Sequence, residues 1–130
     1  MRQLTVVGKD RRDLVADITE LLAGNGIDIR NINSHLAGQD AYITLALSEY
    51  HRGFRLLMDA GYNTVSDDSV LLRVIDKPGT LAKLSRKISE HGINTRAITM
   101  LHHDDCYTIV AISTDSNDKV RELFKESLVS

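Results

Sequence analysis

The chain has 130 residues, of which 42% are hydrophobic and 26% charged, a mixture typical of globular domains. Its formal net charge of -2 argues against a general affinity for nucleic acid or for anionic membranes. A single cysteine excludes an intrachain disulfide, and the first ten residues contain no apolar run that fits a signal peptide or a membrane span. We therefore expect a cytoplasmic protein that recognises its partners locally.

An internal repeat organises the sequence. Residues 10–32 align without gaps with residues 76–98, at an offset of 66, and six aligned pairs are identical. The apolar residues within each segment recur at spacings of three and four, which places them on one face of a helix. The helix of each segment is expected to end near a glycine, Gly26 or Gly92. The repeat predicts two similar domains, residues 1–67 and 68–130.

In the first copy, a β-prone run at residues 4–10 precedes the helix. A hairpin loop that carries Gly38 then separates two strands, the second of which is residues 42–48. A second helix with an apolar stripe follows, and residues 62–68 supply a fourth strand. This order predicts a βαββαβ ferredoxin-like unit.

The second copy repeats the order with two differences. Its third strand, residues 107–113, matches the first copy at an offset of 65, so we expect one residue to be missing from the hairpin at residues 102–106. After its last helix, only residues 128–130 remain for a fourth strand. The predicted fold class is therefore α+β, with two ferredoxin-like units in tandem, the second lacking a clear last strand, and antiparallel sheets with helices on one face.

The strand expected at residues 70–75 would be left with an open edge, and the strands are apolar on both faces. Such surfaces need a cover, for which a neighbouring unit or a second chain is the natural source. We expect at least a homodimer.

Two histidines, two aspartates and the only cysteine stand together at residues 102–106. Neighbours on an extended strand point to opposite faces, so we interpret the segment as a hairpin loop. A metal held across an interface by His102, His103 and Cys106 stays open as an alternative. No base stands at a recognisable spacing to activate Cys106 as a nucleophile. We expect no cofactor.

The residues that open the second copy's helix, Asp76-Lys77-Pro78-Gly79-Thr80-Leu81, and the later segment His91-Gly92-Ile93-Asn94 resemble the ACT domain, a small regulatory module that senses amino acids. The resemblance spans nearly the whole chain. In the first copy Arg12 and Asp13 stand where the family has Pro-Gly, although Asp10, Gly26, Ile27 and Asp28 follow the pattern.

The resemblance implies binding rather than catalysis, because such domains pair side by side and hold an amino acid between the first loop of one and the second strand of its partner. The ligand-binding residues that it implies in the second copy are Asp76, Lys77, Pro78, Gly79, Thr80, Leu81 and Asn94. The weaker equivalents in the first copy are Asp10, Arg11, Asp13, Leu14 and Asp28.

Physical chemistry gives a compatible reason for this assignment. Pro78 suits the start of a helix, and Gly79 lets a ligand carboxylate approach free backbone N–H groups at the positive end of the helix dipole. Asn94 offers a donor and an acceptor, and Asp76 offers an acceptor for an ammonium group. Asp13 stands in the place of Gly79, so we expect its carboxylate to cap the first copy's helix and to leave that copy structural.

The leading hypothesis is a non-catalytic regulatory protein that binds an amino acid and acts on an enzyme or another regulator. RNA-recognition motifs share the βαββαβ order, and Tyr42 and Tyr107 could stack bases, although no basic-aromatic run accompanies them. An acylphosphatase-like hydrolase is a weaker alternative, suggested by residues 52–55 (RGFR), which fall in a predicted helix rather than in a phosphate-binding loop.

Overall fold

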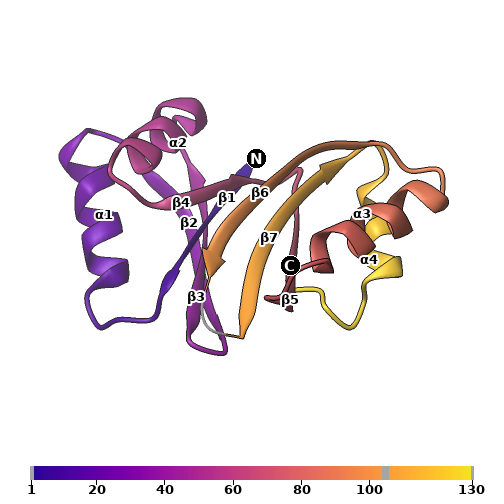
Figure 1. The fold of residues 1–130 in the computed structure, drawn as a ribbon. Coiled ribbons are helices and arrows are strands. Elements are labelled where there is room, and N and C mark those ends of the chain that lie inside the picture. The colour runs from indigo at the N-terminus through magenta and orange to yellow at the C-terminus, as the bar shows by residue number, and fades with distance from the viewer. Residues whose placement is uncertain (1, 104–105, 130) are drawn as a thin grey trace. The chain divides into compact units, whose positions relative to one another are not determined.

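The computed structural model of the chain describes residues 2–103 and 106–129. The chain divides into two compact units, residues 1–67 and 68–130 (Figure 1). Among the described residues, no helix combines the length and the apolar character needed to cross a membrane.

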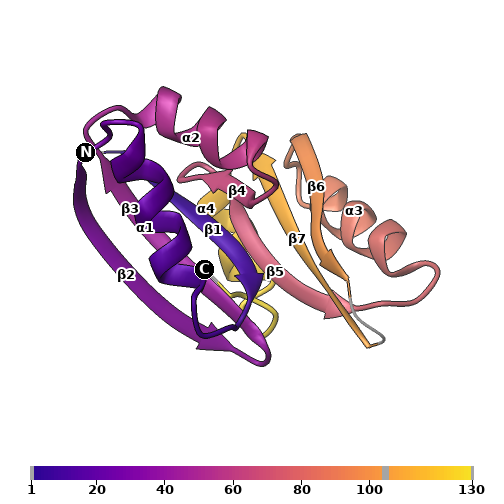
Figure 2. The ribbon, with the colours of Figure 1, turned by 90° about the vertical axis from the view of Figure 1, so that its left-hand side faces the viewer.

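The first unit is a four-stranded antiparallel sheet with two helices. Its elements are β1 (Gln3–Lys9), α1 (Leu14–Gly24), β2 (Ile29–Ala37), β3 (Asp40–Leu47), α2 (Tyr50–Asp59) and β4 (Asn63–Ser66). The strand order β2-β3-β1-β4 places the first and third strands at the centre, as in a ferredoxin-like unit. Both helices lie on the same side of this sheet (Figure 2).

The core of the first unit forms between the helices and one face of the sheet. Leu14, Ile18 and Leu22 recur every fourth residue on α1 and are buried. They pack with alternate residues of the central strands, including Leu4 and Ile43. The helical and strand periodicities therefore point their apolar residues into the same layer.

The second unit repeats this plan with one regular strand fewer. Its elements are β5 (Val70–Ile75), α3 (Thr80–Glu90), β6 (Thr95–His103), β7 (Tyr107–Thr114) and α4 (Asn117–Leu123). The order β5-β7-β6 matches β1-β3-β2 of the first unit. Leu84 and Ile88 of α3 pack with Leu72, Val110 and other buried residues in a separate core. The predicted fold class is confirmed.

The edge of β5 is not fully open, which corrects one prediction. The Arg73 N–H donates to the carbonyl of Ser127 (2.9 Å), and the Val129 N–H donates to the carbonyl of Leu71 (2.8 Å). Leu128 forms an isolated bridge with Leu72 and packs on the core. Residues 127–129 thus lie beside β5, the position that β4 holds beside β1, and cover part of its edge.

The third strands correspond at an offset of 67, so the predicted offset of 65 is wrong. Leu45 pairs with Leu4 and Ile32. The residues 66 positions after those two, Val70 and Ile98, both pair with Ile112, which makes Ile112 the counterpart of Leu45. The two offsets differ by two residues, and a slip of two keeps every side chain on its own face.

The second hairpin connection is longer than the first, not shorter as predicted. β2 and β3 are joined by residues 38 and 39, whereas β6 and β7 are joined by residues 104–106. The backbones of His102 and His103 belong to β6, so these two residues are not part of the loop. Asp104 and Asp105, which were also predicted to form it, lie outside the described residues.

Candidate functional site

The loop between β5 and α3 leaves the start of the helix exposed. Gly79 is the N-cap residue and has left-handed backbone angles, φ 90° and ψ -13°. Apart from atoms of the neighbouring residues in the chain, no described atom lies within 4 Å of the place where a Cβ would stand on Gly79. The Gly79 carbonyl accepts the first helical bond from the Lys83 N–H (3.0 Å), and the Thr80 N–H reaches back to Lys77 (3.3 Å). A glycine is suited to this conformation because side chains disfavour positive φ.

The same loop lies against the connection between β6 and β7. The Asp76 N–H donates to the carbonyl of Cys106 (2.8 Å), and in the first unit the Asp10 N–H donates to the carbonyl of Gln39 (2.9 Å). Each first loop is therefore fixed at the end of the sheet where its hairpin turns. Cys106 is exposed at this end.

Asp13 does not cap α1 through its side chain, which corrects the predicted self-cap. It holds the N-cap position with φ -97°, but within the described part of the chain its carboxylate makes no capping hydrogen bond. Arg11, two residues before Asp13, donates to Asp17 (2.8 Å), and this hydrogen bond raises the pKa of Arg11. Leu14 is buried in the core of the first unit, so its side chain is not available to a ligand.

Asp76 and Asn94 do not meet within one unit. β5 and β6 each run antiparallel to the intervening β7. Ile75 pairs with Tyr107 where β7 begins, and Thr95 pairs with Thr114 where it ends. Asp76 and Asn94 consequently lie at opposite ends of the sheet.

Asn94 already has a partner inside its unit. Its backbone N–H donates to Asp115 Oδ1 (3.0 Å), and its side-chain amide donates to Asp115 Oδ2 (3.1 Å). The backbone bond from Asn94 lowers the pKa of Asp115, as do the Asn94 amide and the charge of Arg96, while desolvation opposes them. Asp28 takes the same place in the first unit, where its N–H donates to Ser48 Oγ (3.0 Å).

Arg30 and Arg96, which follow Asp28 and Asn94 by two residues, form β-bulges that the sequence did not reveal. The pairing of β2 shifts between Ile29 and Asn31, and that of β6 shifts at the aligned place, so Arg30 and Arg96 are the extra residues of two β-bulges. Arg30 forms an ion pair with Asp28 (3.1 Å). The identity of the two arginines in the alignment was the only signal, and it does not indicate a bulge.

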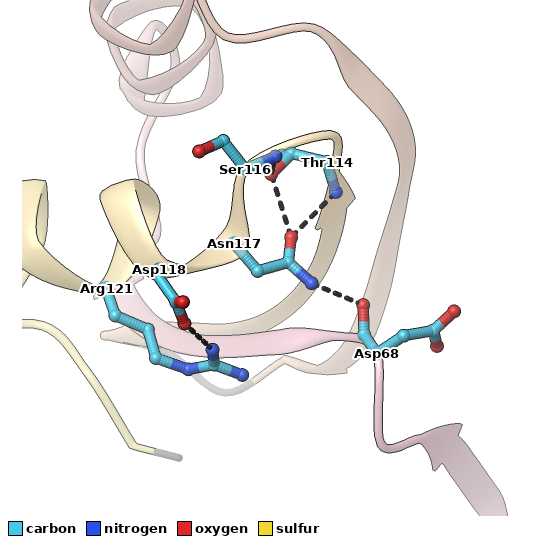
Figure 3. Close-up of polar contacts among 6 residues, drawn as sticks. All are labelled: Asp68, Thr114, Ser116, Asn117, Asp118 and Arg121. Carbon is cyan, nitrogen blue, oxygen red and sulfur yellow. Dashed lines mark hydrogen bonds and ion pairs between the residues drawn. The ribbon is translucent and has the colours of Figure 1, made fainter.

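A polar network fixes the beginning of α4 at the end of the second sheet where Asn94 lies (Figure 3). Asn117 Oδ1 accepts from the backbone N–H and the hydroxyl of Thr114, both at 2.8 Å. Its Nδ2 donates to the carbonyl of Asp68 (2.6 Å), which precedes β5. Asn117 thus joins the end of β7, the start of α4 and the segment before β5.

The alternatives from the sequence find little support in these contacts. In the described residues no group of three histidine, cysteine or acidic side chains could hold a metal. The side chains of His102 and His103 lie outside that description. The Tyr107 ring is covered by Arg73, 3.9 Å from its centroid, and Tyr42 stacks on His35 at 5.3 Å. Tyr42 is fully buried and is not presented for base stacking, whereas the Tyr107 ring is partly exposed beside Arg73.

The short arginine segment at residues 52–55 lies within α2, as expected from the sequence. Arg52 donates to Glu49 (3.0 Å) and to the carbonyl of Asn25 (2.6 Å). These bonds hold Arg52 against its own unit. The segment therefore does not form a phosphate-binding loop.

No protein-family model matches the chain, and no curated protein matches it. Among solved structures, protein BT0572 from Bacteroides thetaiotaomicron is similar with a TM-score of 0.49 and 21% identity, over 98% of this chain and 90% of that one. The regulatory subunit of aspartate kinase from Thermus thermophilus is similar with a TM-score of 0.44 and 14% identity, over 96% of this chain and 91% of that one. The regulatory subunit of aspartate kinase from Thermus flavus is similar with a TM-score of 0.42 and 16% identity, over 96% of this chain and 90% of that one. At these values the similarities assign neither a family nor a function.

Proposed function

We propose that this chain is a non-catalytic, cytoplasmic regulatory protein that consists of two ACT-like units and binds an amino acid through the second unit. The observation that carries the proposal is the exposed, left-handed Gly79 inside the segment Asp76–Leu81. A ligand carboxylate could approach the backbone N–H groups of this helix start without displacing a side chain. The ferredoxin-like order of both units agrees with the resemblance seen in the sequence.

The ligand pocket would have to be completed by another unit. Asp76 and Asn94 lie at opposite ends of their own sheet, so a ligand at the Gly79 loop needs its second wall from a neighbour. In the proposed arrangement that wall is the beginning of β2 or β6 of a neighbouring unit, where Asp28 or Asn94 stands. Binding would then change how the units pair, which is how the protein would act on an enzyme or a regulator.

A thermal-shift screen with the twenty amino acids is the first test, because a ligand that binds only the folded state raises its melting temperature. Calorimetry then measures the affinity of the best ligand. If none of the twenty raises the melting temperature at millimolar concentration, the amino-acid hypothesis fails.

Variants at Gly79 test the site itself. We expect Gly79→Asp to weaken binding at least tenfold relative to Gly79→Asn, because only the aspartate repels a ligand carboxylate at the helix start. The two variants share the strain of a side chain at φ 90°, which makes Gly79→Asn the matched control. Asp13→Gly should leave the affinity nearly unchanged. Loss of binding in Asp13→Gly with binding retained in Gly79→Asp would reverse the roles of the two copies.

A further inference from the structure

The first unit has an open depression at the end of its sheet where β1 begins, β4 ends and α2 begins. We call it the α2 pocket, and its volume of about 310 Å³ is at the lower end for sites that bind small molecules. Ser66 at the end of β4 pairs with Leu4 near the start of β1, which brings these segments together. The residues that line the pocket are Arg2, Tyr50, His51, Phe54, Arg55 and Ser66.

The α2 pocket carries an excess of basic side chains. Arg2 comes from the segment before β1, whereas His51 and Arg55 are four residues apart on α2 and therefore share a helix face. Asp67 lies 3.7 Å from Arg2 Nε and is an acidic partner for that arginine. Within the described residues, the side chain of Arg55 forms no hydrogen bond or ion pair. Arg55 therefore brings to the pocket a positive charge that the described part of the unit does not neutralise.

Aromatic rings form another wall of the α2 pocket. Tyr50 and Phe54 are partly buried against the core of the first unit, with ring centroids 6.0 Å apart. The Arg2 guanidinium lies 4.1 Å from the centroid of the Tyr50 ring and donates to the Tyr50 hydroxyl (3.4 Å). These contacts hold Arg2 at the pocket. The pocket thus places cationic groups beside flat apolar surface.

The corresponding corner of the second unit is built differently (Figure 3). Asn117, the first residue of α4, donates through its side-chain amide to the carbonyl of Asp68 (2.6 Å). The equivalent positions in the first unit hold Tyr50, the first residue of α2, and Arg2. Arg121 of α4 is paired with an acidic residue one turn earlier (3.1 Å). Internal polar contacts therefore occupy this corner in the second unit, so the fold alone does not require a basic pocket there.

We infer that the α2 pocket binds a small organic phosphate, with the phosphate group between Arg2 and Arg55 and a flat ring of the ligand against Phe54. The acceptor oxygens of a phosphate point in several directions, which suits basic groups that reach it from two segments of the chain. A carboxylate is planar and is satisfied by a single guanidinium. Side chains on a helix face make these contacts, so no backbone loop around the phosphate is needed.

This site is separate from the amino-acid site proposed at Gly79, because every residue that lines it belongs to the first unit. The inference therefore does not rest on the proposed function. It gives a binding role to the first copy, which was expected from the sequence to be structural.

Isothermal titration calorimetry of the full chain with phenyl phosphate is the first test, because this probe consists of a phosphate group and a ring. We expect it to bind roughly fivefold more tightly than inorganic phosphate, which has no ring to contact Phe54. It should bind roughly tenfold more tightly than benzoate, whose carboxylate engages one arginine and not two. Its affinity should fall when the salt concentration is raised from about 50 mM to about 500 mM.

Variants test the two walls of the pocket separately. Arg55→Gln should weaken the binding of both phosphates by roughly tenfold. Arg12→Gln is the matched control and should leave the affinity nearly unchanged, because Arg12 is exposed in the loop after β1, at the opposite end of that strand from Arg2. Phe54→Leu keeps an apolar side chain but removes the ring, so it should reduce the preference for phenyl phosphate over inorganic phosphate. Melting temperatures establish that each variant is folded during the titration.

NMR chemical-shift mapping locates the bound probe. Phenyl phosphate should shift the amide signals of residues 50–55 and leave that of Thr80, next to Gly79, unchanged. Shifts at Thr80 in place of α2, equal weakening by Arg55→Gln and Arg12→Gln, or no binding at millimolar phenyl phosphate would each overturn the inference. Benzoate that binds as tightly as phenyl phosphate would overturn the phosphate assignment, and a preference for phenyl phosphate that survives Phe54→Leu would overturn the ring contact.

Discussion

Asn94 donates both its backbone N–H and its side-chain amide to Asp115. From the sequence, an asparagine after a helix-ending glycine is a reasonable ligand-binding residue, because its amide can donate and accept. Asp115 is 21 residues away, and no pattern in the sequence indicates that the two side chains meet. The opposite holds for Gly79, whose left-handed backbone could be anticipated from the Pro-Gly pair before a helix.

The contact with Asn94 makes a prediction about acid stability. The folded pKa of Asp115 lies below its ordinary value of 3.8, mainly because the carboxylate accepts the Asn94 N–H. A group with a lowered folded pKa stabilises the fold above roughly pH 4, and this contribution is lost as the pH falls through the folded pKa. Asn94→Ala removes the side-chain donor and should raise the pKa of Asp115 toward 3.8.

Carbon-13 NMR titration of the Asp115 carboxyl group measures this change. Arg96→Gln is the comparison, and it should raise the pKa by less because the charge of Arg96 contributes less than the Asn94 amide. An Asp115 pKa at or above 3.8 in the unchanged protein would contradict the contact.

Helix positions and strand order followed from the sequence, whereas strand register did not. The stripe of Leu14, Ile18 and Leu22 has the helical period, which has few competing alignments. A strand pattern repeats every two residues, so a register shifted by two keeps the alternation of apolar residues. Residues 42–48 share three identical residues with the second copy at an offset of 65 and none at 67, so the sequence favoured the wrong register. The backbone pairing shows the correct one, in which Leu45 corresponds to Ile112.

The segment at residues 127–129 could not be predicted as an edge strand, because three residues carry too little pattern. Its role leads to a test with Val129→Pro, which removes the N–H that donates to Leu71. We expect a loss of about 0.5–1.5 kcal/mol of unfolding free energy and faster hydrogen exchange at the Arg73 amide, which donates to Ser127.

Val129→Ala keeps the backbone donor and is the control for lost side-chain packing. Urea denaturation gives the free energies, and NMR-detected exchange reports on the Arg73 amide. If that amide is as protected in Val129→Pro as in Val129→Ala, residues 127–129 do not stabilise the edge of β5.

At the scale of the whole molecule, the described residues form two hydrophobic cores that share no residue. Leu22 and Ile88 are aligned positions of the repeat, and each side chain is fully buried in its own core. Composition and repeat length indicated two domains, because each half has its own helix stripe and its own apolar strands. The partner surfaces of the units were not predictable, since they depend on which faces meet.

The separate cores predict separate responses to core mutation. Leu22→Ala and Ile88→Ala should each cost about 2–5 kcal/mol, because each leaves a cavity among buried side chains. Hydrogen exchange should accelerate mainly in β3 for Leu22→Ala and mainly in β7 for Ile88→Ala. Equal acceleration in both strands for either variant would indicate that the two units unfold as one.

The β-bulges at Arg30 and Arg96 have a consequence for the history of the molecule. A bulge needs an inserted residue, and the two insertions stand at the same aligned place with the same amino acid. By contrast, the loop sequences, the hairpin lengths and the last strand differ between the copies. The simplest account is that one ancestral unit already carried the bulge and its arginine before the gene segment was duplicated. On this account, the position of the bulge has been kept in both copies while most of the surrounding side chains have changed.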